Sequence, residues 1–498
     1  MHNDQSDCRP TNETDPPCNI PATGQLETAL HRWIKGAGND LPNIFAVGGA
    51  VRDHLLGRRL NDVDIACRCA EKTAAKIAAS RPFQTTTVTL EKKPHAPCFR
   101  VINKTAPNDF IDVVDMQGVS IRDDLCRRDF TINAMAAEIQ PDGQIAGIVD
   151  PLAGLADLTK QRIRICRPDC FVADPLRMFR AFRLAAVLDF TISPETMALV
   201  KKHHRNITQT AFERITAEFF ALLSLTGSFP FIQMMDQTGL LDALFPEIPP
   251  MRGCRQNAYH HLDVWEHALS TMANCETILS APEHFFAGAA GKIMEIMERH
   301  NAIALLKLGA LFHDAGKPPA KRFDAEKRRP TFHGHADIGA NMAKTIAERM
   351  KLSVRDGQRF TTLVAHHMRP HELAKPGVKK TTAIKWFRRL GDSSIAVLVL
   401  AAADCLAKRG KKTAHAEKDQ LLKWICSAAT EYLDVLKPQF DRPTLLTGND
   451  LLEMGMAPGP AMGRLLAKIR TLQDEGTIQD REAALSTGLR MLQEGKHI

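Results

Sequence analysis

The stretch from Ile44 to Arg68 reads IFAVGGAVRDHLLGRRLNDVDIACR and decides the fold of the N-terminal region. An apolar run opens it, Gly48 and Gly49 interrupt the run, and apolar residues then recur at helical spacing. This pattern predicts a strand, a tight turn and a helix. Because a glycine turn lets backbone amides approach a phosphate, and Arg52 adds a charged donor in the first helical turn, the stretch suits a phosphate group.

The end of the same stretch alternates carboxylates with β-branched residues, in the order Asp62-Val63-Asp64-Ile65. Successive side chains of a strand face opposite ways, so we expect both acids on one side. Neighbouring carboxylates repel each other unless a divalent cation neutralises them. A phosphate cradle beside a metal-binding pair predicts nucleotidyl transfer.

Taken in this order, the strand, glycine turn, Val-Arg-Asp helix and D-x-D strand resemble the DNA-polymerase-beta-like nucleotidyltransferases. Within them the sequence is similar to the bacterial tRNA nucleotidyltransferase and poly(A) polymerase group, class II of the CCA-adding enzymes. The resemblance implies an α+β fold. A small mixed-sheet nucleotidyltransferase head would be followed by an all-α neck, an HD domain and a helical tail.

A third acid comes from the alternating segment FIDVVD at 110–115. Asp112 and Asp115 are three apart on a predicted strand and therefore face opposite ways, so only one can join the metal site. The third carboxylate of the family falls on Asp112. We therefore predict Asp62, Asp64 and Asp112 as the catalytic ligands of Mg²⁺, in a two-metal reaction that activates a hydroxyl and holds a triphosphate.

Two further segments predict nucleotide contacts. The segment DLCRRDFTINAM at 124–135 resembles the family's RRDFT-x-NA motif, which implies contacts to triphosphate and ribose. In DPLRMFRAFR at 174–183, an Asp and three Arg recur every three residues of a predicted helix. In the family the Asp and first Arg read the base edge of CTP or ATP, and the usual preceding Glu is Ala173 here. The predicted nucleotide-binding residues are Gly48, Gly49, Arg52, Arg127, Arg128, Asp129, Asn133, Asp174, Arg177, Arg180 and Arg183.

Histidines gather in the second half of the chain, where a His-Asp doublet lies in the segment HDAGK at 313–317. Their order and spacing resemble the HD-domain metal phosphohydrolases. The predicted ligands are His267, His313, Asp314, His335, His366 and Asp404. Imidazole and carboxylate suit a divalent transition metal, which would acidify a bound water for attack on a phosphoester. We expect His203, His204, His260 and His371 to be solvent-facing or to cap helices.

Composition sets wider limits. The 498 residues include 65 Lys plus Arg against 57 Asp plus Glu, a modest basic excess that fits a polyanionic partner and also many unrelated enzymes. No apolar run reaches the roughly 18 residues of a membrane span, and no signal-peptide pattern opens the chain. We therefore expect a cytoplasmic protein without a membrane partner. The 12 Cys lack paired C-x-x-C sets, which indicates reduced thiols.

The predicted domains are a disordered tail at 1–24, the nucleotidyltransferase head at 25–158, a neck with the nucleotide-template helix at 159–250, the HD domain at 251–410 and a helical tail at 411–498. Within the head, 91–108 has no clear period and is predicted to be a mobile loop. The turn-rich segment 455–463 opens an amphipathic helix. It resembles the tail of HD-containing tRNA nucleotidyltransferases, which suggests tRNA as partner and acceptor.

These features predict a tRNA nucleotidyltransferase that adds CCA, or part of it, from CTP and ATP with release of pyrophosphate. Addition of CC alone or A alone stays open. One alternative is a poly(A) polymerase that extends RNA 3′ ends with ATP. Another is an enzyme whose main activity is phosphohydrolysis at the HD centre, acting on RNA 3′ ends. The sequence does not decide the oligomeric state.

Overall fold

The computed structural model of the chain describes residues 24–37, 41, 43–60, 62–80, 84–90, 97–256, 262–299, 301–326, 328–408 and 415–493. Two compact units form: unit 1 comprises 1–210 and 238–240, and unit 2 comprises 211–237 and 241–498. The predicted neck, 159–250, is thus divided between them. The predicted disordered tail lies outside the described residues except for Gly24.

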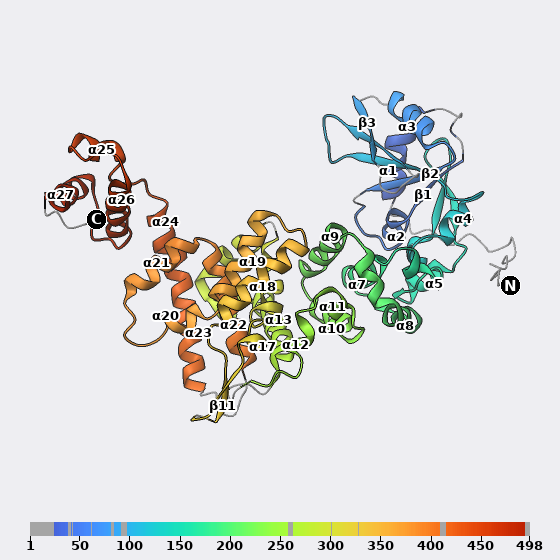
Figure 1. Cartoon of the computed structure of the whole chain (residues 1–498). Coiled ribbons are helices and arrows are strands. Elements are labelled where there is room, and N and C mark those ends of the chain that lie inside the picture. Colours follow the sequence, from blue (N-terminus) through green and yellow to red (C-terminus); the bar gives the residue numbers. More distant parts are fainter. Residues whose placement is uncertain are drawn as a thin grey trace. The chain divides into compact units, whose positions relative to one another are not determined.

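A mixed sheet forms the centre of the head in unit 1, as predicted (Figure 1). Its strand order is β3-β4-β5-β2-β1-β6-β7. Neighbours are antiparallel except β2 and β5, which run parallel. The strands are β1 (Ile44–Val47), β2 (Val63–Cys67), β3 (Thr85–Leu90), β4 (Cys98–Asn103), β5 (Phe110–Asp115), β6 (Ala136–Ile139) and β7 (Ile145–Val149).

One prediction for the head was wrong. Strand β4 lies inside the predicted loop 91–108 and pairs with both β3 and β5. Its segment CFRVIN lacks strict alternation because the strand buries residues toward both faces of the sheet, Cys98 and Val101 among them. Residues 91–96 of that predicted loop lie outside the described part of the chain.

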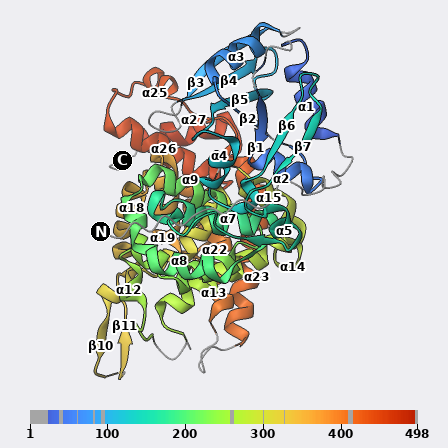
Figure 2. The same ribbon diagram turned by 90° about the vertical axis from the view of Figure 1, so that its right-hand side faces the viewer.

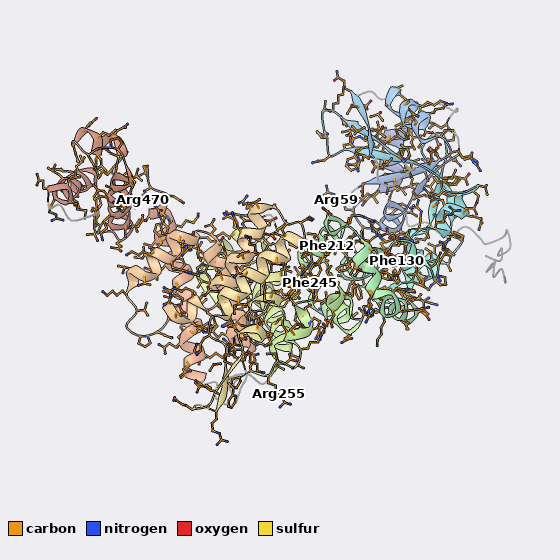
Figure 3. The ribbon with its side chains drawn as sticks, in the orientation of Figure 1. Arg59, Phe130, Phe212, Phe245, Arg255 and Arg470 are labelled. Carbon is orange, nitrogen blue, oxygen red and sulfur yellow. The ribbon has the colours of Figure 1, made fainter. Side chains whose placement is uncertain are left out.

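Helices complete unit 1. The head helices are α1 (Gln25–Ile34), α2 (Gly49–Leu55), α3 (Ala70–Ala79), α4 (Ile121–Cys126), η1 (Thr131–Asn133) and α5 (Gly154–Thr159). Then follow α6 (Cys170–Ala173), α7 (Arg177–Leu188), α8 (Pro194–His203) and η2 (His204–Gln209), with the short parallel pair β8 (Arg162–Ile163) and β9 (Thr191–Ile192). Phe130, labelled in Figure 3, is fully buried and pairs with Ile165, which joins η1 to the helical part.

Unit 2 is helical apart from one hairpin, which Figure 2 shows extending away from the helices. Its first part contains α9 (Phe212–Leu223), α10 (Phe229–Gln237), α11 (Leu240–Leu244) and α12 (Ile248–Met251). Next come α13 (Val264–Ser280), α14 (Pro282–Phe286), η3 (Ala287–Ala289), α15 (Ala290–Met297), α16 (Ala302–Phe312) and α17 (Lys317–Ala320). The hairpin strands are β10 (Arg322–Asp324) and β11 (Arg329–Thr331).

The remaining helices are α18 (His335–Arg349), α19 (Val354–His366), α20 (Arg369–Leu373), α21 (Lys380–Leu390), α22 (Ser393–Ala407), α23 (His415–Glu431), η4 (Tyr432–Leu436), α24 (Lys437–Phe440), α25 (Gly448–Glu453), α26 (Pro460–Asp474) and α27 (Arg481–Gln493). Phe245, labelled in Figure 3, packs against Phe219 of α9 and Phe312 of α16, with ring centroids 5.9 and 5.0 Å apart. These aromatic contacts join the start of unit 2 to its central helices.

No single helix in the described part of the chain is both long and apolar enough to cross a membrane. Taken together, α21 and α22 have the length and apolar composition of a membrane span, but a bend of 115° separates the two helices.

Candidate functional site

The glycine turn of the head has the predicted strand-turn-helix form. Gly48 has a φ of +74°, a region that favours glycine, and a Cβ there would lie 3.2 Å from an Nη atom of Arg128. A Cβ on Gly49 would lie 3.4 Å from an Nη atom of Arg52. Two guanidinium groups therefore reach this turn. A side chain at either glycine would crowd them.

The acids at 64 and 112 lie side by side. Asp64 and Asp112 are register partners on the parallel strands β2 and β5, so both side chains point to the same face of the sheet. Asp62 precedes β2 and is two residues from Asp64, so strand alternation continued through it places it on that face. Asp115 instead accepts a hydrogen bond from the Ala70 N–H at the start of α3. The sheet register thus places Asp112, and not Asp115, beside Asp64.

Arg100 is an additional member of this group that the sequence did not single out. It is the register partner of Asp112 on β4, and its Nε and Nη2 atoms donate to the two carboxylate oxygens at 2.7 and 2.9 Å. Asp112 is buried, and its carboxylate raises the pKa of Arg100, with a smaller contribution from Asp62. The three acids are not among the described groups whose ligand atoms all lie within 4.8 Å of one another.

The all-oxygen donor set still fits a magnesium ion, a hard cation that prefers carboxylates. A carboxylate has about four lone-pair sites, and the Arg100 fork occupies two of those on Asp112. The assignment of Asp62, Asp64 and Asp112 as metal ligands stays a prediction.

The RRDF segment forms a buried chain of hydrogen bonds. Arg52 donates to Asn133 at 2.7 Å, and Asn133 donates to Asp129 at 3.2 Å. Asp129 also accepts from Arg180 of α7 at 2.9 Å and from the Phe130 N–H. Burial alone would raise the pKa of Asp129, but the Arg180 charge and these hydrogen bonds lower it to about 2. The network fixes Arg52 beside the glycine turn.

The predicted template residues sit at the start of α7. Asp174 lies before the helix in extended backbone, which differs from the predicted continuous helix because Pro175 follows it. Arg177 opens α7 and donates to the backbone carbonyls of Arg127 and Arg128 at 3.1 and 3.4 Å. These bonds hold the guanidinium of Arg177 against the RRDF segment. Burial alone would lower the pKa of Arg177, but the neighbouring Cys170 and, to a smaller extent, Asp129 and Asp174 raise it.

The remaining predicted nucleotide contacts are less constrained. Arg127 is exposed, whereas Arg128 donates to Asp124 at 2.8 Å, and Arg183 is half-buried farther along α7. Their contacts to a nucleotide stay predictions.

Four predicted HD residues meet in unit 2. A capping box between Asp263 and Glu266 begins α13 and places His267 in its first turns. The Nε2 atom of His267 lies 2.9 Å from Asp404 and 3.8 Å from Asp314, and the His313 Nε2 atom lies 3.2 Å from Asp314. His267, His313 and Asp314 form one group whose ligand atoms all lie within 4.8 Å of one another.

A second group of the same kind contains Asp314, His335 and His367. The Nε2 atoms of His335 and His367 lie 3.5 and 3.6 Å from the Oδ1 atom of Asp314, whose Oδ2 atom faces the first group. The prediction of His366 was therefore wrong by one residue. Neighbouring residues point about 100° apart around a helix, so only one of two adjacent histidines can face the cluster.

Backbone carbonyls orient these imidazoles. The Nδ1 atoms of His313, His335 and His367 each lie 2.7 to 2.9 Å from the carbonyl three residues earlier, which directs each Nε2 inward. The buried Nε2 of His313 makes no hydrogen bond of normal geometry among the described residues. Such an atom, beside imidazoles and carboxylates, fits a divalent transition metal.

Three more residues border the HD centre. Against expectation, His371 is not solvent-facing: its Nε2 atom lies 3.2 Å from Asp404. Lys408 lies 2.7 Å from Asp404, and Lys317 lies 2.6 Å from Asp314. Lys317 lies in the quoted segment HDAGK but was not predicted, and only the packing of α20 and α22 reveals the other two.

Charge and burial set the protonation of this centre. Burial lowers the pKa of His335 to about 4, which keeps its imidazole neutral near pH 7. Burial alone would raise the pKa of Asp314, but the charges of His313 and Lys317 hold it well below the usual range. A neutral imidazole such as that of His335 and an ionised carboxylate such as that of Asp314 are the forms that bind metals, whereas the charged His313 must first lose its proton. A Cβ on Gly316 would lie 2.1 Å from the His335 carbonyl, so this glycine permits the close approach.

Comparisons with known proteins match the two regions that contain these residues. The Poly A polymerase head domain matches residues 44–164, the probable RNA and SrmB-binding site of polymerase A matches 189–251, and the HD domain matches 264–409. The A-adding tRNA nucleotidyltransferase of Deinococcus radiodurans is 31% identical over 452 residues, which cover 89% of this chain and 94% of that protein. The chain belongs to the tRNA nucleotidyltransferase family.

Other tRNA nucleotidyltransferases support the same family and fold. The CC-adding tRNA nucleotidyltransferase of Thermus thermophilus is 30% identical over 447 residues, covering 88% of this chain and 92% of that protein. A Thermotoga maritima CCA-adding enzyme complexed with tRNA is 20% identical with a TM-score of 0.62, covering 94% of this chain and 98% of that one. The family resemblance and the α+β prediction are confirmed, and the chain is a nucleotidyltransferase with two metal-dependent types of domain.

Proposed function

We propose that this chain adds CCA, or part of it, to the 3′ end of tRNA from CTP and ATP, with release of pyrophosphate. The observation that carries the proposal is the register pairing of Asp64 with Asp112, in the same unit as the glycine turn with its two guanidinium groups. Bound Mg²⁺ would be held by Asp62, Asp64 and Asp112, and would neutralise the triphosphate and acidify the attacking hydroxyl. Arg52 and Arg128 would hold the triphosphate near the turn.

Asp174 and Arg177 would read the incoming base. Hydrogen bonds to two backbone carbonyls hold the Arg177 guanidinium in place, so its remaining donors keep a defined direction. A fixed donor beside an Asp acceptor can match the edge of one base and mismatch another. Relatives of similar identity carry the names A-adding and CC-adding, so the number of nucleotides added is the quantity to measure.

The test uses the purified full chain and tRNA transcripts that lack A, CA or CCA. Each transcript receives CTP alone, ATP alone or both, and the products are resolved at single-nucleotide length. Growth by at most three nucleotides followed by arrest supports the proposal, and the transcript that grows identifies CCA, CC or A addition. Long tails of A on any RNA would instead support poly(A) polymerase activity.

We infer a second activity, hydrolysis of phosphoesters at RNA 3′ ends, from the HD centre. Its support is the position of Asp314 between two groups of imidazoles, with one carboxylate oxygen toward each. A divalent metal held there would supply an acidified water. Lys317 and Lys408 carry positive charge at the edge of this centre, where they could bind a substrate phosphate.

The two activities can be separated by variants. Phosphate release from a tRNA with a terminal phosphate or 2′,3′-cyclic phosphate should survive Asp64→Asn and vanish in Asp314→Asn. Nucleotide addition to an undamaged tRNA should show the reverse pattern. Phosphate release that survives Asp314→Asn would refute hydrolysis at the HD centre.

A further inference from the structure

The hairpin formed by β10 and β11 extends away from the helices of unit 2 (Figure 2). It joins α17, which begins at Lys317, to α18, which begins at His335. Lys317 borders the HD centre and His335 belongs to it. A ligand bound to the hairpin would therefore lie beside that centre.

The hairpin segment carries an excess of positive charge. Residues 321–331 read KRFDAEKRRPT, with five Lys or Arg against two acids, Asp324 and Glu326. Outside the segment, the next acids along the chain are Asp314 of the HD centre and Asp337 of α18. The exposed cations among the described residues of the segment are Lys321, Arg322, Arg328 and Arg329.

These four cations are not neutralised by neighbouring acids. None of them forms an ion pair with another residue that the structure describes. Arg322 donates to the Lys321 carbonyl at 2.8 Å, a contact that leaves its charge in place. Unpaired Lys and Arg side chains of this kind attract the phosphates of a nucleic acid.

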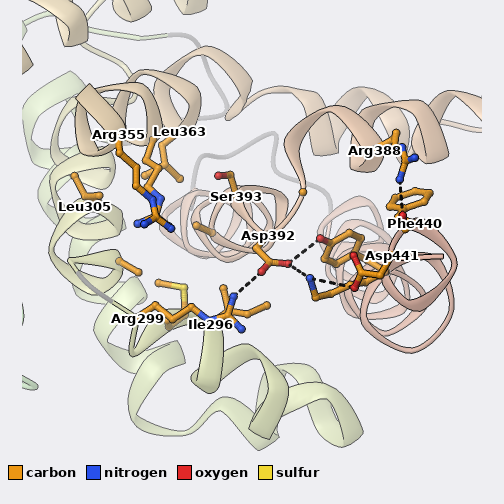
Figure 4. Close-up of a pocket in the computed structure, with 17 residues that line it drawn as sticks. Ile296, Arg299, Leu305, Arg355, Leu363, Arg388, Asp392, Ser393, Phe440 and Asp441 are labelled. Atoms are coloured by element: carbon orange, nitrogen blue, oxygen red, sulfur yellow. Dashed lines mark hydrogen bonds and ion pairs between the residues drawn. The ribbon is translucent and has the colours of Figure 1, made fainter. Parts of the chain in front are cut away.

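A cavity elsewhere in unit 2 shows the contrast. Its volume is about 430 Å³, and Arg299, Arg388 and Lys437 are among the cations that line it (Figure 4). Asp392 pairs with Arg299 at 2.6 Å and with Lys437 at 3.1 Å, as the dashed lines in Figure 4 show. Arg388 pairs with Asp474 at 3.0 Å. The charge of that cavity is largely neutralised, whereas the charge of the hairpin is not.

An aromatic ring stands among the cations of the hairpin. Phe323 of β10 is 71% exposed. The strand register places Phe323 on one face of the hairpin and Arg322 and Arg329 on the other. Because a two-stranded hairpin is only about 5 Å across, long side chains from both faces can contact one strand of RNA. Exposed rings together with cations are typical of surfaces that bind single-stranded nucleic acid.

The base of the hairpin contacts the HD centre directly. The ring of Phe332, which follows β11, lies 5.8 Å from the Nζ atom of Lys317, and the Phe332 carbonyl lies 2.8 Å from Nδ1 of His335. Arg329 is three residues from Phe332, or about 10 Å in an extended strand. A ligand that contacts both the centre and these cations must therefore be longer than a single phosphate group.

The burial of the HD centre limits what can enter it. His313 and Asp314 are buried. The end of a single strand is narrow enough to reach such residues, whereas the body of a duplex is not. Unpaired bases are also the ones that can stack on an exposed ring.

We propose that the β10–β11 hairpin binds the unpaired 3′ end of an RNA whose terminal phosphate enters the HD centre. Phe323 stacks on a base, and Lys321, Arg328 and Arg329 contact backbone phosphates. This binding role rests on the proposed phosphohydrolysis, and it specifies the substrate as an RNA end rather than a small phosphoester.

Photo-crosslinking of the full chain tests the contact without any hydrolysis. The probe is a single-stranded RNA that has a 3′ phosphate and a 5-iodouridine near that end. Irradiation should join the probe to a peptide within 321–332, which mass spectrometry identifies. A blunt duplex RNA with the same 3′ phosphate should require at least a tenfold higher concentration for half-maximal crosslinking.

Variants remove the ring and the charges separately. Phe323→Ala, and the double substitution Arg328→Gln with Arg329→Gln, should each raise the half-saturating RNA concentration by about tenfold, because a base stack or two phosphate contacts are lost. Phe323→Trp should keep the wild-type value. The matched control, Lys344→Gln with Lys351→Gln, removes two exposed cations on and after α18 and should change nothing. Unchanged circular dichroism and Co²⁺ binding establish that each variant folds.

The dependence on salt gives a second readout for the charges. On a logarithmic plot of affinity against salt concentration, the slope should fall by about 0.7 for each phosphate contact that the double variant loses. The slope of the control should equal that of the wild type.

Three results would overturn the proposal: no crosslink within 321–332, equal half-saturation by the duplex, or unchanged half-saturation in both hairpin variants. Adsorption to vesicles rich in phosphatidylserine, lost in Phe323→Ala and without any RNA crosslink, would assign the hairpin to a membrane surface instead.

The two proposals fail in different ways. A crosslink in the hairpin without phosphate release from the RNA would refute hydrolysis and leave the RNA contact standing. Phosphate release with the same KM in wild type and both hairpin variants would refute the RNA contact and leave hydrolysis standing.

Discussion

The head and the HD centre bring carboxylates together by different means. In the head, Asp64 and Asp112 meet through the register of two strands, and an arginine fork holds one of them. In the HD centre, Asp314 and Asp404 sit at the ends of helices among imidazoles and two lysines. The first site offers oxygen alone and the second offers nitrogen and oxygen. The difference teaches that each scaffold gathers its own set of donor atoms, and that these donors set the metal each site suits.

The strongest test of the head side of this comparison is Asp64→Asn. We expect nucleotide addition to fall by about a thousandfold or more, because a neutral amide no longer balances the charge of the cations. Single-turnover extension of tRNA lacking CCA measures it. Asp115→Asn lies on β5 but caps α3, so it should change the rate little. Equal losses in both variants would contradict the register argument.

A pair of adjacent substitutions tests the HD side. His367→Gln should weaken metal binding by at least tenfold, or about 1.4 kcal/mol, because it removes one ligand of the second group. His366→Gln is the matched control and should retain the metal. Titration with Co²⁺, followed by its visible absorption, measures affinity without any assay of hydrolysis. Loss of metal in the His366 variant alone would restore the sequence-based choice.

The buried network of the head makes a prediction about stability. The pKa of Asp129 is about 2, below its ordinary value near 3.9, so the carboxylate stabilises the fold above pH 4 by about 2 kcal/mol. This contribution disappears as the pH falls through 2. Asp129→Asn should therefore destabilise the head at pH 7, and the difference from wild type should shrink between pH 4 and 2.

Urea unfolding of the full chain, followed by hydrogen exchange of peptides around β6, measures this difference. Asp142→Asn at an exposed turn is the control. A difference between the Asp129 variant and wild type that does not change over this pH range would contradict the assigned ionisation.

The smallest expected effect concerns Arg100. Its charge lies beside Asp112 and opposes a cation there, so Arg100→Gln should lower the Mg²⁺ concentration for half-maximal activity by about threefold. Arg122→Gln, exposed on α4, should leave it unchanged. An increased requirement for Mg²⁺ in the Arg100 variant would mean that the arginine positions the carboxylate rather than competing for it.

Much of the head could be predicted from its sequence because strand alternation has a period of two. Alternation allowed only one of Asp112 and Asp115 to join the site, the family resemblance chose Asp112, and the structure pairs Asp112 with Asp64 while Asp115 binds the start of α3. The inner strand β4 was missed, and Arg100 with it, because a strand that buries residues toward both faces carries no clear alternation. Which residues face each other on neighbouring strands depends on the strand order, and this order cannot be read from a single sequence.

Helical regions were harder to assign residue by residue. In the doublet His366-His367, the sequence does not show which histidine faces the cluster. Only the orientation of α19 about its axis distinguishes the two. His371 and Lys408 reach Asp404 from segments far apart in the sequence. The cavity of unit 2 likewise gathers arginines between positions 299 and 388, which have no common motif.

The parallel pairing of β2 with β5 has a consequence for how the enzyme matures. Between these strands lie α3, β3 and β4, and β5 pairs with both β4 and β2. Closing a long loop costs conformational entropy, so pairings between distant parts of the chain slow folding. Until β5 has paired with β2, Asp64 and Asp112 do not lie side by side, so we expect a head that lacks this pairing to be inactive.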